Sequence, residues 1–345
     1  MVGPLISSVR LWEFKGIRAC EEPIRLSRFT VLIGRNNSGK TSVLEALALL
    51  PYSLLRRGPT NYNLQPFRKS WSDALNILHG GLSSLIYGYT GKAKINYLVK
   101  GNMITRILST SGEIRTLINN EELAVGIIAP RAYESEYEKR LADIMGIKDP
   151  EELLFSIIFL PNDSFLLSSL AKEIASITEW AKVEKSGANV AIVRDLIAKA
   201  VHDRFTEATV RFNSIVLRKE LPDGRVIYVK AADLGDGVER VLIYGLWLET
   251  YKPKVVLWDD IEASAHPGLI EAVLEWLASR DWQVVLTTHS YDVLERLVAI
   301  EPEGASVVVL KKGADDVLEP RVLSLDELRE MLESHVDVRK VVDIL

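Results

Sequence analysis

GRNNSGKT, residues 34–41, is the stretch that decides the fold. It meets the GxxxxGK[ST] pattern of a phosphate-binding loop at every required position. Its two glycines allow a tight turn whose N–H groups face phosphate oxygens, and Lys40 can reach the β- and γ-phosphates. The apolar run FTVLI directly precedes the loop, and TSVLEALALL directly after it has a helical apolar spacing. This strand, loop and helix together predict a nucleotide site, with ATP as the expected ligand.

The nucleotide contacts are expected from the loop itself and from the first residues of the helix after it. The Thr41 hydroxyl is placed to ligate Mg²⁺, and the positive N-terminal end of the helix adds to the attraction for phosphate. The expected contacts are Gly34, Asn36, Asn37, Ser38, Gly39, Lys40, Thr41 and Ser42.

Two further apolar runs end in polar residues of the kind that a P-loop requires. KVVLWDD ends in Asp259 and Asp260; we expect Asp259 to hold Mg²⁺ and Asp260 to polarise the attacking water. QVVLTTHS carries His289 just beyond a strand of buried type, which favours a sensor of the γ-phosphate. The sequence thus predicts three neighbouring strand ends around one triphosphate.

A glycine-rich helix start lies shortly before the Asp259 strand. In DLGDGVER, Gly235 and Gly237 can present N–H groups to an anion, and Arg240 can assist. More than half of the chain separates Lys40 from Asp259, so the segments between them must form a second lobe.

The pattern along the chain predicts an α/β fold: a P-loop NTPase with a mixed sheet core, an antiparallel β lobe and a helical insertion lobe. Strands are expected in 1–50, antiparallel strands from SSLIYGYTG onward in 51–130, and helices throughout 131–205. In 206–345, strands and helices alternate as in a parallel sheet covered by helices. All four segments are interpreted as one domain spanning 1–345.

Composition limits the setting and the partners. The chain has 345 residues and a net charge of −5, so a nucleic-acid contact requires a local patch. The single cysteine, Cys20, excludes a disulfide framework and a cysteine-based zinc site, and fits a reducing compartment. No apolar run reaches spanning length, and the N-terminus does not look like a signal peptide. We expect a cytoplasmic protein that makes no membrane contact.

One segment is a candidate for DNA contact. No acidic residue lies between Glu45 and Asp73, and basic residues alternate there with aromatic ones. Phosphate contacts combined with aromatic stacking are typical of single-strand binding, whereas the same composition also fits a solvated loop with its aromatics in the core. The residues concerned are Arg56, Arg57, Arg68, Lys69, Tyr52, Tyr62, Phe67 and Trp71.

Taken together, these motifs resemble ABC-type ATPase heads of the RecF/SMC/OLD-like branch, which are often grouped with AAA-family ATPases. The run from LISSVRLWEF to SVLEAL resembles that branch from its first strand onward. DDIEASAHP is similar to its acidic pair, LGDGVER to its Ser-x-Gly-x-x-Arg signature, and IIFLPNDSFLL to its Pro-x-Asp stretch. DVRKV, near the end, is also in keeping with the branch.

The resemblance implies a head that dimerises on ATP. Each of two nucleotides would be held by the P-loop of one subunit and capped by the signature helix of the other, so that Gly235, Gly237 and Arg240 would act in trans. Hydrolysis would separate the heads and pass the motion to DNA or to a partner. The chain has neither heptads nor a Toprim nuclease domain, so a nuclease or effector would be a separate subunit.

Several positions depart from the family pattern. The catalytic base, normally Glu, is Asp260, which is one methylene shorter and predicts slow turnover. Glu262 is an alternative base. Neither glutamine of the chain occupies the Q-loop position, so Asp163 is considered as a substitute near the metal.

Three functions remain open at this point. The first is a dimeric ATPase that serves DNA repair or anti-phage defence with a separate partner. The second, motivated by Asp260, is a nucleotide-gated binding module with negligible hydrolysis. The third, a transporter ATPase subunit, is disfavoured by the signature, the missing Q-loop glutamine and the RecF-like N-terminus.

Overall fold

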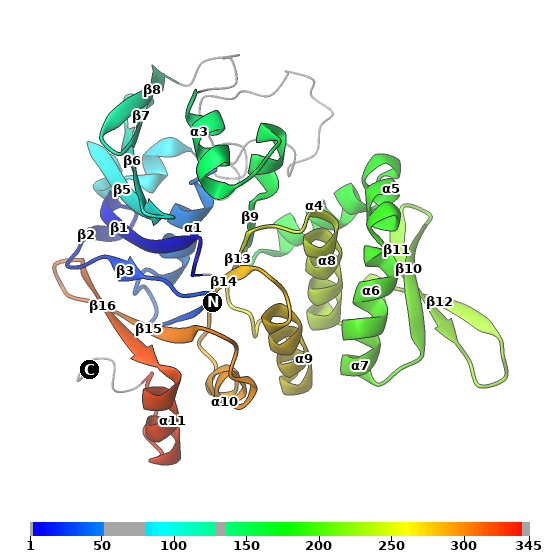
Figure 1. Cartoon of the computed structure of the whole chain (residues 1–345). Helices are drawn as coiled ribbons and strands as arrows, with labels where there is room; N and C mark the ends of the chain where they lie inside the picture. Colours follow the sequence, from blue (N-terminus) through cyan, green and yellow to red (C-terminus); the bar gives the residue numbers. More distant parts are fainter. Residues whose placement is uncertain (1–2, 52–80, 128–135, 340–345) are drawn as a thin grey trace.

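The computed structural model describes residues 3–51, 81–127 and 136–339. Within these residues, thirteen strands form one large mixed sheet, and three more form a small separate sheet. Helices cover the parallel half of the large sheet, and the small sheet projects beside the helical lobe (Figure 1). The α/β fold with a mixed sheet core that the sequence predicts is therefore confirmed.

Five parallel strands form one end of the large sheet, in the order β15, β4, β14, β13, β9, with β9 at the edge. Their bounds are β4 Phe29–Ile33, β9 Ile157–Leu160, β13 Val255–Trp258, β14 Gln283–Thr287 and β15 Ala305–Lys312. Every residue of β4, β9, β13 and β14 is buried, as expected for strands covered on both faces. The ends of β4, β13 and β14 therefore lie side by side, and the predicted site forms there.

Alternate residues of these strands face two different cores. In β4, Val31 and Ile33 pack in one core with helices α8 to α11, while Leu32 packs in the other with helix α1. The helices on the first side are α8 Asp236–Tyr251, α9 Pro267–Ala278, α10 Tyr291–Ile300 and α11 Leu325–Glu333. On the second side lie α1 Lys40–Ala48 and α3 Glu136–Met145. The P-loop is thus fixed between two packed layers.

The remaining strands of the large sheet pair antiparallel, except for β2 and β16, which pair in parallel. The meander β8, β7, β6, β5 continues into β1, and β2 and β16 connect β1 to the five parallel strands, with β3 also pairing with β1. Their bounds are β1 Ile6–Phe14, β2 Ile17–Cys20, β3 Ile24–Arg25, β5 Lys92–Val99, β6 Asn102–Ser109, β7 Glu113–Ile118, β8 Glu121–Ile127 and β16 Val317–Ser324. This antiparallel part packs over α1.

The helical lobe leads from β9 to the signature-like helix start. It contains α4 Ser164–Ile174, α5 Ile177–Ser186, α6 Ala188–Ile192, a π-helical turn at Val193–Ile197 and α7 Ala198–Val201. The small sheet follows as β10 Phe205–Arg211, β11 Ser214–Glu220 and β12 Val226–Lys230. A short 3-10 turn at Ala231–Asp233 then leads into α8.

Two local predictions were wrong. Residues 157–160 lie in a segment predicted as helical but form β9, because parallel pairing with β13 buries all four apolar side chains. The stretch SSLIYGYTG was predicted as a strand but forms two 3-10 turns, Leu82–Leu85 and Tyr87–Tyr89, with one isolated bridge between Ile86 and Phe14. Gly88, in the left-handed region, interrupts the extended backbone there.

Two further expectations concern DNA contact and membrane contact. The basic and aromatic segment proposed for DNA contact, from Tyr52 to Trp71, lies outside the described residues. Among the residues that are described, no helix combines the length and the apolar character needed to cross a bilayer.

Candidate functional site

The P-loop follows β4 and requires glycine at two positions. A Cβ on Gly34 would lie 2.4 Å from the Leu310 carbonyl oxygen and 2.5 Å from the Ser38 hydroxyl, so no side chain fits there. Gly39, at φ +90°, caps the N-terminus of α1 in the left-handed region. These two glycines let the chain leave a buried strand, turn and enter a helix within a few residues.

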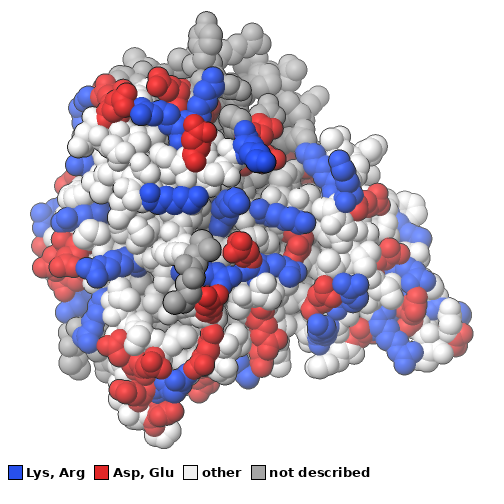
Figure 2. All heavy atoms as spheres, in the orientation of Figure 1, with Lys and Arg blue, Asp and Glu red and all other residues white. Residues whose placement is uncertain are grey.

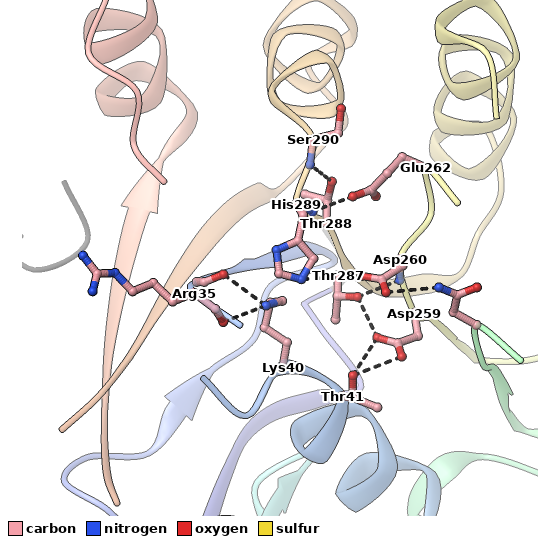
Figure 3. A network of polar contacts seen from close by, with 12 residues as sticks. Arg35, Lys40, Thr41, Asp259, Asp260, Glu262, Thr287, Thr288, His289 and Ser290 are labelled. Atoms are coloured by element: carbon pink, nitrogen blue, oxygen red, sulfur yellow. Dashed lines mark hydrogen bonds and ion pairs between the residues drawn. The ribbon is translucent and has the colours of Figure 1, made fainter. Parts of the chain in front are cut away.

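The Lys40 side chain folds back over this turn. Its ammonium group donates hydrogen bonds to the carbonyl oxygens of Gly34 (3.0 Å) and Arg35 (3.1 Å), as Figure 3 shows. Burial lowers the pKa of Lys40, while the carboxylates of Asp260 and Asp259 act in the opposite direction. The ammonium group therefore lies inside the loop, where a β- or γ-phosphate would be bound.

Thr41 and Asp259 face each other at the mouth of the site. The Thr41 hydroxyl lies 3.1 and 3.0 Å from the two carboxylate oxygens of Asp259, and the Thr287 hydroxyl donates to the same carboxylate at 2.7 Å. Burial raises the pKa of Asp259 to about 6, and the neighbouring Asp260 charge adds to this shift. A buried carboxylate beside a threonine hydroxyl is the pair of oxygen ligands that Mg²⁺ prefers.

Asp260 lies one residue further along, with its backbone at φ +45°. Its N–H donates to the Thr287 hydroxyl (2.8 Å), and its carboxylate accepts a hydrogen bond from the Asn162 side-chain amide (3.2 Å). The His289 Nε2 lies 3.9 Å from the other carboxylate oxygen. In Figure 3 the His289 ring lies between Lys40 and the two aspartates, so the three strand ends do converge as the sequence predicts.

Glu262 contacts the backbone of the loop after β14. Its carboxylate accepts a hydrogen bond from the His289 backbone N–H at 2.6 Å and fixes the loop after β14. This contact occupies Oε1 and disfavours the expected alternative role of Glu262 as the base, whereas Oε2 is buried and makes no hydrogen bond in the described structure.

Asp163 makes a capping contact at the start of a helix. Its carboxylate caps α4 by accepting from the Leu166 N–H at 2.8 Å, so the geometry does not support the expected metal role. The preceding residue, Asn162, reaches the site instead through Asp260. Asn162 was missed because the Pro-x-Asp stretch was interpreted through Asp163 alone; its place between Pro161 and Asp163 was the available signal.

The glycine-rich helix start contains one exposed and one packed glycine. Gly235 is exposed at φ +93°, with open space around it. A Cβ on Gly237, in contrast, would lie 2.2 Å from the carbonyl oxygen of Ser264, so α8 begins in close contact with the loop after Asp260. Gly237 is thus needed for packing within the chain, and Gly235 is free to meet a ligand.

Arg240 also makes its contact within the chain. The residue is 8% exposed, and its guanidinium donates to the Asn162 side-chain oxygen at 2.7 Å. Arg240, Asn162 and Asp260 thus form one continuous polar chain within the subunit, and the expected role of Arg240 in trans stays a prediction.

The other predicted phosphate contacts lie around the loop. Asn36 and Asn37 are exposed, and Ser42 is half-buried in the first turn of α1. Ser38 is buried, and its hydroxyl makes no hydrogen bond in the described structure, as expected for a group that awaits an anion. Clefts line both sides of the loop: one reaches Thr288 and His289, and the other reaches the turn after β15.

The residues present fit a magnesium ion bound together with a nucleotide. Thr41 and Asp259 supply two oxygen ligands, and the described residues contain no group of three or more His, Cys, Asp or Glu that could hold a metal ion alone. Phosphate oxygens and waters would complete the shell, which is how Mg²⁺ is commonly bound in nucleotide sites.

Two family models match the chain. The model "AAA ATPase domain" matches residues 5–78, which include the P-loop. The model "AAA domain, putative AbiEii toxin, Type IV TA system" matches residues 130–295, which include the signature-like helix, the Asp259 strand and His289. No curated protein matches the chain.

Solved structures show the same fold. The SMC head bound to the C-winged helix domain of ScpA is similar with a TM-score of 0.63 at 15% identity, over 94% of this chain and 99% of that chain. The Pyrococcus furiosus SMC head with an extended coiled coil, bound to the C-terminal domain of ScpA, is similar with a TM-score of 0.61 at 13% identity. The match covers 96% of this chain and 99% of that chain. The Pyrococcus yayanosii SMC head with a coiled coil and joint is similar with a TM-score of 0.55 at 11% identity, over 96% of this chain and 99% of that chain.

Proposed function

We propose that this chain, an AAA-type ATPase head with the fold of an SMC head, binds ATP with Mg²⁺ at the P-loop and hydrolyses it slowly. The contact between Thr41 and Asp259 is the observation that supports this proposal best. It joins the helix after the P-loop to the strand end that carries the two aspartates, which is where a triphosphate and its metal need ligands.

Different residues would bind the phosphates and the Mg²⁺ ion. Backbone N–H groups of the loop and the Lys40 ammonium group neutralise the phosphate oxygens, and the unpartnered Ser38 hydroxyl offers a further contact. Thr41 and Asp259 would hold the Mg²⁺ ion, which would supply positive charge against the negative charge that develops on the phosphate oxygens.

Asp260 is the proposed base that orients and deprotonates the attacking water. Asn162 and His289 flank its carboxylate, one on each oxygen, so the side chain is held at the edge of the site. Aspartate is shorter than the usual glutamate, and a misplacement of about 1 Å can cost on the order of 10²-fold in rate. We therefore expect slow turnover.

Calorimetric titration of the purified chain with ATP, in the presence and absence of Mg²⁺, tests the binding step. Lys40→Ala removes the buried cation and is expected to lower the affinity by at least about 100-fold, or roughly 3 kcal/mol. Lys172→Ala, in the last turn of α4, is the matched control and is expected to bind as the wild type does. A wild type that takes up no ATP would refute the proposal.

Dimerisation on ATP is part of the same proposal. The exposed Gly235 at the start of α8 is available to a nucleotide held by a second copy, whereas Gly237 and Arg240 are packed in their own chain. We expect sedimentation velocity to detect a dimer with ATP and a monomer without it, and Lys40→Ala to stay monomeric under both conditions. A wild type that remains monomeric with saturating ATP would remove the dimer from the proposal.

A nucleotide-gated module with negligible hydrolysis is the second candidate, and Asp260 at the base position is the observation that favours it. Single-turnover measurement separates the two. A wild-type rate no higher than the rate of spontaneous ATP hydrolysis without protein, together with tight ATP binding, would support the module.

For the pathway, we propose DNA repair or anti-phage defence together with a separate nuclease or effector subunit. The description of one matching model names a type IV toxin–antitoxin system, and two of the similar SMC heads are bound to ScpA. On the face drawn in Figure 2, Lys and Arg cross the middle while acidic residues gather at the α11 end, so DNA would be attracted locally. Salt-dependent binding to single- and double-stranded DNA tests that contact.

We also propose a reducing, cytoplasmic setting. Cys20 is buried, and burial raises the pKa of its thiol to about 11, so this thiol stays protonated and unreactive at neutral pH. A transporter subunit remains the least favoured role; co-purification with a multi-span membrane protein would revive it.

A further inference from the structure

The loop at 288–290, just after β14, is held by side chains that lie far away in the sequence. The His289 backbone N–H donates to Glu262 at 2.6 Å, and the His289 carbonyl oxygen accepts from the Arg339 guanidinium (Nη1) at 2.7 Å. Both backbone polar groups of His289 are therefore fixed, although its ring has only a distant contact with Asp260. The ring is 41% exposed, so little else restrains it.

The Arg339 guanidinium is itself fixed in orientation. Its Nε and Nη2 donate to the two carboxylate oxygens of Asp337 at 2.8 and 2.7 Å, and its central carbon lies 5.5 Å from the centre of the Tyr291 ring. A guanidinium is a planar fork of donors, so a two-point pair with Asp337 leaves Nη1 aimed in one direction. That direction is the His289 carbonyl oxygen.

The segment that carries this pair is anchored to the body of the protein. Val338, between Asp337 and Arg339, is fully buried in the core that includes α10 and α11, and the Val336 N–H donates to the Met331 carbonyl oxygen at 2.8 Å. We call residues 336–339 the C-terminal brace. Asp337 and Arg339 of the brace line the same cleft as Gly34 and Asn36 of the P-loop.

We propose that Arg339 is a positioning residue, which holds His289 against the P-loop through the hydrogen bond to its carbonyl oxygen. The inference rests on the proposed function, because His289 matters for hydrolysis only if a γ-phosphate is bound beside it. In this proposal the C-terminal brace fixes the position of the His289 ring, and the P-loop binds the phosphates.

This division of roles has a kinetic consequence. Loss of the Arg339 contact lets the loop move, and a displacement of about 1 Å in a catalytic group can lower a rate on the order of 10²-fold. The P-loop contacts remain. We expect Arg339→Gln to lower kcat about 10-fold and to leave KM for ATP within about twofold, which is the pattern of an interaction used only in the transition state.

The experiment combines a structural readout and a kinetic one on the full chain. The first follows the imidazole NMR signals of the five histidines without nucleotide, with the His289 signal assigned from His289→Ala. Arg339→Gln should move or broaden that signal and leave the other four in place. The matched control is Arg329→Gln in α11, where Arg329 pairs with Asp326 and Glu301 away from the site, and it should move none of them.

The kinetic readout is a double-mutant cycle in single-turnover hydrolysis. If Arg339 acts through His289, then Arg339→Gln should cost about 10-fold in the wild type and nothing further in His289→Ala. Asp337→Asn, which leaves the guanidinium in place but frees its orientation, should show a smaller loss that also disappears in His289→Ala. This second variant keeps the test valid if Arg339→Gln folds poorly.

The outcomes separate this inference from the proposed function. An unchanged His289 signal in a folded Arg339→Gln overturns the inference, as does an equal loss of rate in the presence and absence of the His289 side chain. A wild type that neither binds nor hydrolyses ATP defeats the proposed function, while the NMR comparison still decides whether the brace holds His289.

Discussion

Thr41 and Asp259 are in direct contact, with the threonine hydroxyl 3.0 and 3.1 Å from the two oxygens of the carboxylate. They belong to different elements, α1 and the end of β13, which the parallel sheet brings together through β14. Because Asp259 is also buried, this contact has consequences both for metal binding and for the stability of the chain without ligand.

The metal role of Thr41 predicts a difference between two small substitutions. Thr41→Val keeps the shape and removes the hydroxyl ligand, so the affinity for ATP with Mg²⁺ should fall about 10- to 100-fold, whereas the affinity without Mg²⁺ should change little. Thr41→Ser keeps a hydroxyl and should bind like the wild type. Calorimetry in Mg²⁺ and in EDTA measures both, and equal losses for Val and Ser would contradict the role.

Asp259→Asn should stabilise the chain in the absence of metal and nucleotide. Burial raises the folded-state pKa of Asp259 to about 6, above its value of 3.8 in an unfolded chain, so the folded state binds the proton more tightly. Stability from this group is then present at low pH and is lost as pH rises from about 4 to about 6. Above that range the charged carboxylate costs about 2–3 kcal/mol, which asparagine avoids.

Urea unfolding in EDTA at pH 4.5 and pH 7.5 tests this prediction. The gain in free energy of unfolding from Asp259→Asn should be small at pH 4.5 and should reach its full size at pH 7.5. Asp281→Asn, at an exposed position, should show no such dependence on pH. An Asp259→Asn variant less stable than the wild type at pH 7.5 would contradict the assignment of burial as the dominant effect.

The sequence predicted the parts of the site that local residues determine by themselves. The glycine pattern of the P-loop, the apolar run before Asp259 and the run before His289 each specify a strand end, and the parallel order then brings them together. The four-residue strand β9 was not predicted because IIFL alone fits a buried helix or a buried strand equally well, and only pairing with β13 decides between them.

The contacts that were missed depend on tertiary structure. Asn162 joins Arg240 to Asp260 from the variable position of the Pro-x-Asp stretch, and Arg339 reaches His289 across 50 residues. Arg240 is buried within its own chain because α8 packs there, and no local sequence pattern predicts that packing.

Gly237→Ala should destabilise the fold although alanine favours helices. The added Cβ would lie 2.2 Å from the Ser264 carbonyl oxygen, so the backbone of α8 or of the loop after Asp260 must move, at a cost of about 1–3 kcal/mol. Gly268→Ala in the first turn of α9 is the matched control, since its Cβ would meet only the His266 ring at 3.7 Å. Chemical denaturation should show a lower free energy of unfolding for Gly237→Ala and an unchanged one for Gly268→Ala. If both variants were as stable as the wild type, the backbone near Ser264 would have to move at no measurable cost.

The assignment of the base predicts opposite results for two neighbouring acids. Asp260→Ala should lower single-turnover hydrolysis about 10²- to 10⁴-fold, the range for loss of a general base, without weakening ATP binding. Glu262→Gln keeps an oxygen that can accept from the His289 N–H and should cost less than about tenfold. Asp260→Glu lengthens the side chain by one methylene and should raise the rate by up to about tenfold, because it brings the carboxylate nearer to the water. If Asp260→Ala and Glu262→Gln both left the rate unchanged, the base would have to be sought elsewhere in the chain or in a second subunit.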